Sequence, residues 1–357
     1  MRRPPLVALL ALVALVPSPR TARADEESPR LRAWHDEIDR SIDAGLAFLV
    51  RKQQTCQRGD GSFEDWNGET NAIAGLSGMA CLAKGHLPGD SPHGRLVERT
   101  VDYILGTQSD TGYLGVRGCK MYGHAIATLY LSEVSGMIDP ARQARIDPVL
   151  ARAAKVILDA QAANPMGAWR YEPTSTDADI SVTGWNLMAL RSLRLNGAAV
   201  PKAAIDRALS FVDSCTEPGG GGGYFYHTPS WYRRGYWLGG PANAARTSVA
   251  LLCRELSGLH GDPRSEKAAD WLAATLAGMR GEDYNDPYTM YYAAQALFQV
   301  GGPRWEAFAE RLYKHAVEQQ QPDGSWQMKP EQGQVYPTAM MVLALTVTYR
   351  QLPIYQR

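Results

Sequence analysis

The chain repeats one sequence pattern at intervals of about fifty residues. Each copy begins with an apolar helical stretch that ends near a glutamine, continues through a glycine–aromatic turn, and then enters a more apolar helix. In a looser copy Cys215 replaces the glutamine, and the copy around 278–284 keeps only the helices. The clear copies run from Gln53 to 60–63, from Gln108 to 111–113, from Gln161 to 167–169, and from 319–321 to 323–326. Helix pairs that cannot bury their apolar faces alone must stack or close into an array.

The two helices of each copy distribute their apolar residues differently. In the first helix, Ile38, Ile42 and Leu46 recur at helical spacing with charged residues between them. The second helices are apolar on nearly every side: 72–82, 125–131 and 339–347. A helix that is apolar all round is buried all round. We therefore predict an all-α fold over residues 35–357, a single (α/α)6 toroid with six amphipathic outer helices and six apolar inner helices.

The loops between these helices have unequal lengths. Links from an inner helix to the next outer helix are short, as at 196–200. Links from an outer helix to its inner partner are mostly long: 55–69, 162–178, 216–242 and 321–336. Because every hairpin runs the same way, the long loops meet at one end of the ring, beside the N-termini of the inner helices. We call this end the mouth and predict that it carries the functional site.

Residues 1–24 have the pattern of an export signal. Two arginines precede the apolar run 6–16, and residues 22–24 form a small-x-small cleavage motif. We predict cleavage near Ala24, a short lead at 25–34, and a periplasmic or secreted protein; an uncleaved anchor is the alternative. The whole chain has 37 basic and 37 acidic residues without a basic stripe, so nucleic acid is not a predicted partner. No later stretch is long enough to be a transmembrane segment.

The repeat resembles the QW-type repeat of the terpenoid cyclase and protein prenyltransferase superfamily, over essentially the whole chain after the signal. The segment 177–185, Asp-Ala-Asp-Ile-Ser-Val-Thr-Gly-Trp, is similar to a recurring motif of secreted bacterial squalene-cyclase-like proteins. The segment 121–125, Met-Tyr-Gly-His-Ala, is similar to another. The resemblance implies the same toroid and an isoprenoid-like apolar ligand in its centre.

The resemblance also implies a catalytic acid. Squalene–hopene cyclases protonate an alkene with an acid of an Asp-x-Asp-Asp motif at the start of an inner helix. Asp177 and Asp179 match two acids of that motif, which makes Asp179 the expected general acid, and Ile180 replaces the final acid. Such an acid must be unusually acidic and shielded from water, with aromatic walls for the cation. The residues expected to form these ligand-binding walls are Trp169, Trp185, Tyr122, Tyr288 and Tyr291. The alternative for Asp179 is a helix N-cap.

Two other features suggest different chemistry. Asp213 and Cys215 have the spacing of a prenyltransferase zinc pair, with His227 after them, but they end an outer helix instead of starting an inner one. We therefore predict neither a metal site nor a cofactor.

Cys56 and Cys119 lie in loops of successive copies. Because an exported protein can form disulfides, a bond between these two cysteines is possible, and two unpaired thiols are the alternative.

The segment 219–240 combines five glycines with many aromatic residues and two arginines. Its ligand-binding candidates are Trp231, Tyr232, Arg233 and Trp237, which can form a lid or stacking platform over the mouth or can simply pack the loop onto the scaffold.

His124 directly precedes an apolar run. It is a candidate ligand or proton shuttle, with a hydrogen-bonded core histidine as the alternative.

Three functions remain open at this stage. The leading hypothesis is a cyclase-like protein that holds an isoprenoid or other apolar ligand, with acid chemistry at Asp179. The second is a non-enzymatic module that binds a protein or glycan partner through the mouth loops. The third is an (α/α)6 glycan hydrolase or lyase that uses two of the acids near the mouth. A dry aromatic cavity would favour the first, and a ring filled by inner-helix side chains would favour the second.

Overall fold

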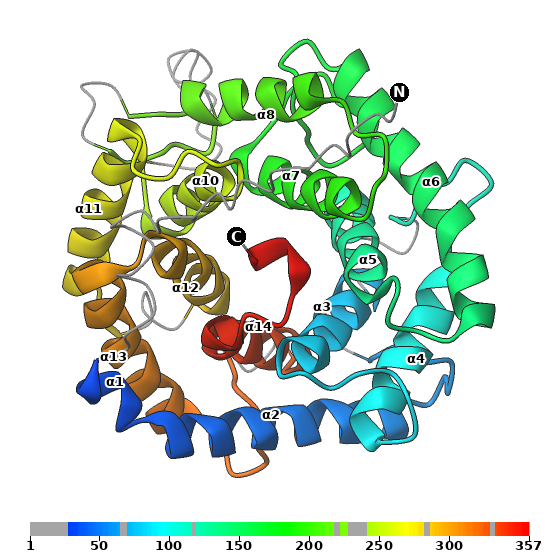
Figure 1. The fold of residues 1–357 in the computed structure, drawn as a ribbon, viewed down its shortest axis with the longest axis horizontal. Helices are drawn as coiled ribbons and strands as arrows, with labels where there is room; N and C mark the ends of the chain where they lie inside the picture. The colour runs from blue at the N-terminus through cyan, green and yellow to red at the C-terminus, as the bar shows by residue number, and fades with distance from the viewer. Residues whose placement is uncertain are drawn as a thin grey trace, which may run out of the picture.

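The computed structural model describes residues 28–64, 70–115, 119–217, 222–227, 241–281, 286–328 and 333–356. Twelve of its helices pair as six hairpins around one axis (Figure 1). The outer helices are α2 (His35–Thr55), α4 (Pro92–Leu105), α6 (Pro140–Ala163), α8 (Lys202–Ser214), α11 (Pro263–Gly278) and α13 (Gly302–Gln319). The inner helices are α3 (Thr70–Ala83), α5 (Lys120–Val134), α7 (Ile180–Leu195), α10 (Ala244–Leu256), α12 (Pro287–Val300) and α14 (Val335–Leu345).

The ring closes on itself. The last inner helix α14 packs against the first, α3, and the last outer helix α13 packs against α2. A short helix, α1 (Pro29–Arg32), precedes the first hairpin, and two 3₁₀ turns, η5 (Thr346–Tyr349) and η6 (Pro353–Tyr355), follow the last. The predicted all-α toroid is therefore confirmed.

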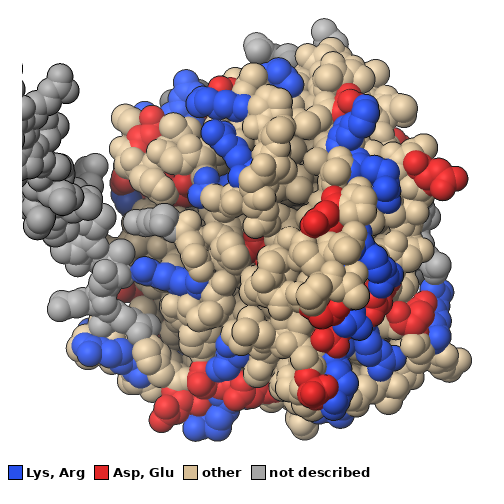
Figure 2. Space-filling view, turned by 45° about the vertical axis from the view of Figure 1, so that its right-hand side comes forward, with Lys and Arg blue, Asp and Glu red and all other residues tan. Residues whose placement is uncertain are grey.

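Burial follows the predicted division into inner and outer helices. In α14, every residue except Tyr336 is buried. The outer helix α4 buries one side, which includes Leu96, Val97 and Val101. Ser91 caps its N-terminus, and the Ser91 hydroxyl accepts a hydrogen bond from the Gly94 amide. Figure 2 shows basic and acidic side chains interleaved over one outer face, without a field of one sign. Within the described residues, no helix is long and apolar enough to cross a bilayer.

Four glutamines of the repeat join neighbouring hairpins. Each sits at the end of an outer helix, where its side-chain amide donates to the carbonyl of its own turn glycine and to a carbonyl of the next outer helix. The acceptor pairs are Gly61 and Leu96 for Gln53, Gly112 and Val149 for Gln108, Gly167 and Ala204 for Gln161, and Gly324 and Ser41 for Gln320. The bond from Gln320 to Ser41 links the last outer helix to the first, so the same device closes the ring.

The turn glycines are required by close approach and by backbone conformation. Gly61 has φ +91°, and a Cβ there would lie 2.2 Å from the carbonyl oxygen of Arg99 in the next outer helix. Gly222 of the looser copy has φ +103° and the same relation to Lys267 of α11. The turn at Gly222 is thus a true member of the repeat, although Cys215 stands where the glutamine would be.

The copies without the glutamine use charged side chains between the outer helices instead. Arg254 of α10, 2% exposed, pairs with Asp213 at the end of α8 and with Asp262 at the start of α11. Arg311 of α13 donates to the carbonyls of Leu276 and Met279 at the end of α11. Asp213 is therefore engaged in an ion pair that joins α8 to α10.

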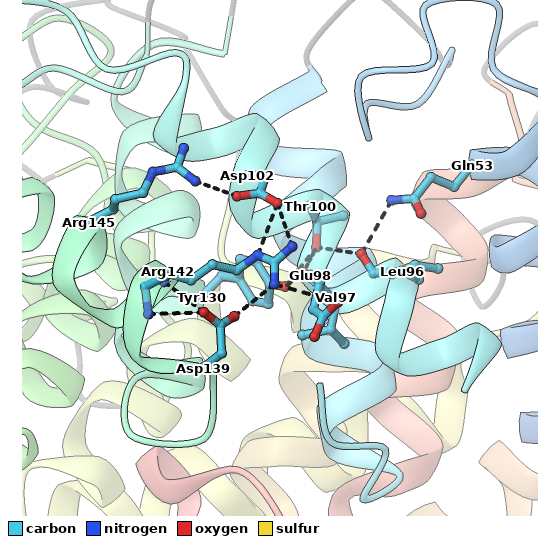
Figure 3. A network of polar contacts seen from close by, with 11 residues as sticks. Gln53, Leu96, Val97, Glu98, Thr100, Asp102, Tyr130, Asp139, Arg142 and Arg145 are labelled. Carbon is cyan, nitrogen blue, oxygen red and sulfur yellow. Dashed lines mark hydrogen bonds and ion pairs between the residues drawn. The ribbon is translucent and has the colours of Figure 1, made fainter. Parts of the chain in front are cut away.

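Figure 3 shows the contacts between α2, α4 and α6. Gln53 reaches Leu96, and the Tyr130 hydroxyl of α5 meets the Thr100 hydroxyl of α4 at 2.7 Å. On the outer surface, Arg142 contacts Asp102, Asp139 and Glu98. These polar groups hold neighbouring hairpins in register around a shared apolar core.

We expect Gln161→Ala to lower the free energy of unfolding by about 2–3 kcal/mol, because two carbonyls lose a buried donor. Gln319→Ala is the matched control, since Gln319 is exposed and lies beside the repeat glutamine Gln320. Urea denaturation of both variants checks the expectation. Equal free energies of unfolding for the two variants would show that the hydrogen bonds of the repeat glutamine do not stabilise the fold.

Two predictions about the chain ends and cysteines have different outcomes. The export signal lies outside the described residues and stays a prediction. No disulfide bond joins Cys56 and Cys119; the Cys56 sulfur lies 3.7 Å from the Ser62 hydroxyl oxygen.

Candidate functional site

Asp179 lies at the mouth, at the N-terminus of inner helix α7. Its carboxylate oxygen Oδ1 accepts the Val182 amide at 2.8 Å, so the predicted N-cap is present. Its backbone amide donates to the Trp169 carbonyl at 3.1 Å, which ties it to the preceding loop. Yet Asp179 is 0% exposed, whereas most capping residues keep their side chains in water. Capping alone does not require this burial.

Arg170 connects the two acids of the motif. Its Nε lies 3.3 Å from Oδ2 of Asp179, and its Nη1 pairs with the partly exposed carboxylate of Asp177. Arg170 itself is 9% exposed. Because Arg170 follows the repeat aromatic Trp169 directly, the turn that fixes Trp169 also places the guanidinium against α7. The motif is therefore an Asp–Arg–Asp cluster in which Asp179 and Arg170 are buried and Asp177 reaches the surface.

Burial raises the pKa of Asp179 to about 6. The amide of Val182, the hydroxyl of Tyr226 and the positive charge of Arg170 oppose this shift, since each favours the ionised carboxylate. The net result is an acid that takes up and releases a proton near neutral pH although it is shielded from solvent. A general acid requires this combination.

Tyrosines surround the cluster. The hydroxyls of Tyr171 and Tyr226 are 2.8 Å apart, and the Arg170 guanidinium lies over both rings, 4.7 Å and 5.8 Å from their centroids. Tyr122 of α5 lies 6.1 Å from Tyr171, centroid to centroid. Burial and the nearby Asp179 raise the pKa of both Tyr122 and Tyr288, so these phenols stay neutral. Aromatic rings and neutral hydroxyls therefore surround the cluster.

Further along the inner helices, aromatic side chains of α7 and α12 pack against one another. Trp185 of α7 stacks on Tyr291 of α12 at 5.6 Å, and it meets the edge of Tyr292 at 5.4 Å. Tyr288 lies 4.8 Å from Tyr292 and connects this group to the mouth. Trp185, Tyr291 and Tyr292 are each at most 2% exposed. We call Trp185, Tyr288, Tyr291 and Tyr292 the aromatic column.

The C-terminal segment lies in the centre of the ring (Figure 1). It contacts Glu133 and Gln299 near the C-terminal ends of α5 and α12, so it lies at the end of the ring opposite the mouth, which we call the floor. The Tyr355 hydroxyl meets that of Tyr291 at 2.5 Å, and the Tyr355 carbonyl accepts from Gln299. The Ile354 amide donates to Glu133 of α5 at 3.1 Å, and η6 also packs against α7. Residues from helices on different sides of the ring therefore converge on this one segment.

Among the predicted site residues, the structure brings Asp177, Asp179, Tyr122, Tyr288, Trp185 and Tyr291 into one continuous cluster. Trp169 is buried next to it, and its indole nitrogen donates to the Ile157 carbonyl at 2.9 Å, so it packs the turn. The predicted loop residues Trp231, Tyr232, Arg233 and Trp237 lie outside the described residues.

His124 has a structural position. Its Nδ1 accepts the Leu114 amide at 3.0 Å, and its Nε2 lies 3.1 Å from the Ala153 carbonyl oxygen. Burial lowers the pKa of His124 to about 4, so the ring is neutral with the proton on Nε2. In other copies a threonine accepts the corresponding amide: Thr183 for Trp169, Thr247 for Tyr224, and Thr338 for Trp326. His124 therefore occupies a repeat position, and an alignment of the copies would have revealed it.

The sequence did not indicate Arg170, Tyr171, Tyr292 or Glu133 as site residues, whereas Tyr226 belongs to the aromatic segment 219–240 that it did indicate. Arg170 and Tyr171 carry only the weak signal of following a repeat tryptophan. Across the part of the chain that the structure describes, no group of three or more His, Cys, Asp and Glu side chains is arranged to hold a metal ion. The described site therefore consists of one buried acid, one arginine and aromatic rings.

The fold is the α/α toroid that terpenoid cyclases and several glycan hydrolases share. Type II terpene cyclase MstE from Scytonema, as a variant in complex with its substrate geranylgeranyl dihydroxybenzoate, matches with a TM-score of 0.60 and 14% identity, over 91% of this chain and 99% of that chain. The GH76A α-1,6-mannanase of Salegentibacter sp. HEL1_6, as an inactive variant with α-1,6-mannotetrose, matches with a TM-score of 0.62 and 8% identity, over 87% and 98%.

A third similar structure, a mutant of a reducing-end-xylose-releasing exo-oligoxylanase, matches with a TM-score of 0.54 and 12% identity, over 94% of this chain and 96% of that chain. No family model matches the sequence, and no curated protein does. Identities this low establish the fold, and the activity has to be argued from the site.

Proposed function

We propose that this chain is an exported, cyclase-like protein that binds an isoprenoid or another apolar molecule at the tyrosine-lined mouth, with Asp179 as its general acid. The observation that carries the proposal is the complete burial of Asp179, whose pKa is raised to about 6 among aromatic rings. The raised pKa makes Asp179 a weaker acid than the resemblance implies, but it keeps the carboxyl protonated up to about pH 6. Burial also keeps water away from the cation, which needs the negative faces of aromatic rings. Tyr122, Tyr171 and Tyr288 supply such faces beside the acid.

In the proposed step, the Asp179 proton passes to one carbon of an alkene and the positive charge develops on the other. The Asp179 carboxylate left behind is stabilised by Arg170 and by the Val182 amide. Loss of a proton from the cation, and its return to the carboxylate, completes an isomerisation or cyclisation without any net change in protons.

The arrangement of charges is less suited to a glycan hydrolase. That chemistry uses two carboxyl groups with different roles, separated by the space for a sugar bond. Here Asp177 and Asp179 both pair with the same arginine. Asp286, another acid near the mouth, is the N-cap of α12 and accepts the amides of Tyr288 and Thr289.

One observation favours a second candidate, a binding module without turnover. The aromatic column and Tyr355 pack against one another inside the ring, and inner-helix side chains packed in this way are expected if the mouth loops bind a protein or glycan partner. The two candidates differ in whether Asp179 is needed for a chemical step.

We expect Asp179→Asn to lower turnover by at least about 100-fold while the fold is kept, because asparagine also caps a helix but donates no acid proton. Purified protein is incubated with farnesol, geranylgeraniol or squalene, and the extract is analysed by gas chromatography–mass spectrometry. Asp286→Asn is the matched control, since it changes an acid that caps a neighbouring inner helix. Turnover in Asp179→Asn at the wild-type rate would rule out the acid, and a wild-type protein that binds these alcohols unchanged would favour the binding module.

A further inference from the structure

Two buried polar atoms at the acid have no hydrogen-bond partner within the described residues. They are Oδ2 of Asp179 and Nε of Arg170. The two atoms lie 3.3 Å apart, but the N–H of Arg170 does not point at the carboxylate, so their ion pair is not also a hydrogen bond. Buried polar groups are almost always hydrogen-bonded, and each exception calls for an explanation.

Contacts on their other sides hold both side chains in place. The second oxygen of Asp179, Oδ1, accepts the Val182 amide at the N-terminus of α7. The Arg170 guanidinium pairs with Asp177 through Nη1 and lies over the ring of Tyr171. Asp179 and Arg170 are 0% and 9% exposed. A donor and an acceptor are therefore fixed side by side, each with its bonding capacity unused.

The two atoms lie close to the surface of the mouth. Asp177, which shares the guanidinium of Arg170, has a side chain that is 28% exposed. Tyr171 and Tyr226 are also partly exposed, and their hydroxyls bond to each other at 2.8 Å. Tyr226 faces Asp179, yet its hydroxyl does not close a hydrogen bond to Oδ2. Arg170 is thus in direct contact with side chains that reach solvent at the mouth.

The chemistry of the two atoms selects the group that fits both. The Nε of Arg170 only donates, whereas the ionised carboxylate of Asp179 only accepts. An anion would meet the negative charge of Asp179, a cation would meet the positive charge of Arg170, and an ether or a ketone has no hydrogen to donate. A hydroxyl group is neutral and does both, since its oxygen accepts from Nε while it donates to Oδ2.

We propose that the ligand of this site is an apolar alcohol whose hydroxyl group binds to Nε of Arg170 and Oδ2 of Asp179 together. Arg170 then selects the ligand as well as pairing with Asp179. A ligand of the same shape without the hydroxyl leaves a buried donor or acceptor unpaired, which such a site penalises. The inference rests on the proposed function for the apolar remainder of the ligand, but it does not depend on turnover.

The test compares two probes with the same carbon skeleton, all-trans-farnesol and its methyl ether. The ether oxygen accepts a hydrogen bond from Arg170 but has no hydrogen to donate to Asp179. We expect the wild type to bind farnesol at least about tenfold more tightly than the ether at pH 8, as measured by isothermal titration calorimetry. Equal affinities would show that the two atoms bind only water. That result, or no binding of farnesol, would overturn the inference.

Asp179→Asn separates hydrogen bonding from shape. Asparagine keeps the helix cap through its oxygen and turns an amide donor toward Arg170. The oxygens of the alcohol and the ether both accept from two donors, so the variant should bind the two probes equally well. Asp286→Asn, at the cap of α12, is the matched control and should keep the preference for farnesol. A preference that persists in Asp179→Asn would come from the extra methyl group and would contradict the proposed alcohol site.

The alcohol site and the proposed acid fail separately. If the wild type prefers farnesol and Asp179→Asn does not slow turnover, the alcohol site stands and the acid is wrong. If Asp179→Asn abolishes turnover of squalene and the wild type binds farnesol and its ether equally, the acid stands and the alcohol site is wrong. Affinity therefore tests the ligand class, and turnover tests the acid.

Discussion

Replacing Arg170 with methionine is expected to destabilise the protein by about 3–5 kcal/mol at pH 8 and by much less at pH 5. The substitution keeps much of the buried volume but leaves the Asp179 carboxylate without its positive partner in a site that is 0% exposed. An unpaired buried carboxylate takes up a proton, and at pH 5 that proton is readily available.

The sign of this pH dependence follows from the pKa of Asp179, which is about 6 in the folded protein against an ordinary value of 3.8. The folded state binds this proton more tightly, so the contribution of Asp179 to stability falls as pH rises from about 4 to about 6 and is constant above. Removing Arg170 raises the pKa further and extends the fall to higher pH. The loss caused by Arg170→Met therefore grows above pH 6.

Arg142→Met is the matched control for this prediction. Arg142 also contacts several carboxylates, but at the outer surface, where its side chain is 27% exposed (Figure 3). We expect a loss of about 1 kcal/mol or less that is similar at both pH values. Urea denaturation at pH 5 and pH 8 measures both variants, and the double variant Arg170→Met/Asp179→Asn should recover much of the loss. An equal loss at both pH values would show that Arg170 acts by packing and not by charge.

The second large effect concerns Glu133 at the floor. Burial raises the pKa of Glu133 to about 7, against the bonds from Ser192 and Ile354 and the nearby charge of Arg191. Its contribution to stability is highest below about pH 4.5 and falls until about pH 7, by about 3 kcal/mol in total. We expect Glu133→Gln to remove this fall, since the amide oxygen still accepts a hydrogen bond and carries no charge.

The measurement is the difference in unfolding free energy between pH 5 and pH 8 for wild type and variant. Glu266→Gln is the control, because it removes the same charge from an exposed ion pair with Arg304. That variant should keep the wild-type pH profile. If the stability of Glu133→Gln depends on pH in the same way as that of the wild type, burial does not raise the pKa of Glu133 in the folded protein.

Several local features were predictable from the sequence because they depend on short-range patterns. The apolar character of 339–347 predicts an inner helix, and Val335–Leu345 is one, with residues 346–349 tightening into a 3₁₀ turn. Asp179 before an apolar stretch predicts a cap, which the bond from Val182 confirms. The repeat glutamines predict equivalent turns, and the structure adds what they bond to.

The candidate site was only partly predictable. The resemblance pointed to Asp177, Asp179 and the aromatic residues near them, but not to Arg170, which acquires its role from a loop that brings it against α7. His124 was a candidate ligand from its local sequence, and the tertiary structure gives both ring nitrogens backbone partners, as the alternative of a core histidine requires. Local patterns do not reveal whether a polar residue faces a neighbouring turn or an open site.

The sequence by itself determined the ring: its period, the division into inner and outer helices, and the end at which the long loops meet. These follow from burial, which leaves a local trace at helical spacing. Only the tertiary structure decided what lies on the axis. Glu133 and Ile354 are 221 positions apart, and Tyr291 and Tyr355 are 64 apart. They meet because the sixth hairpin packs against the first, and a closed ring brings side chains of all the inner helices toward its axis.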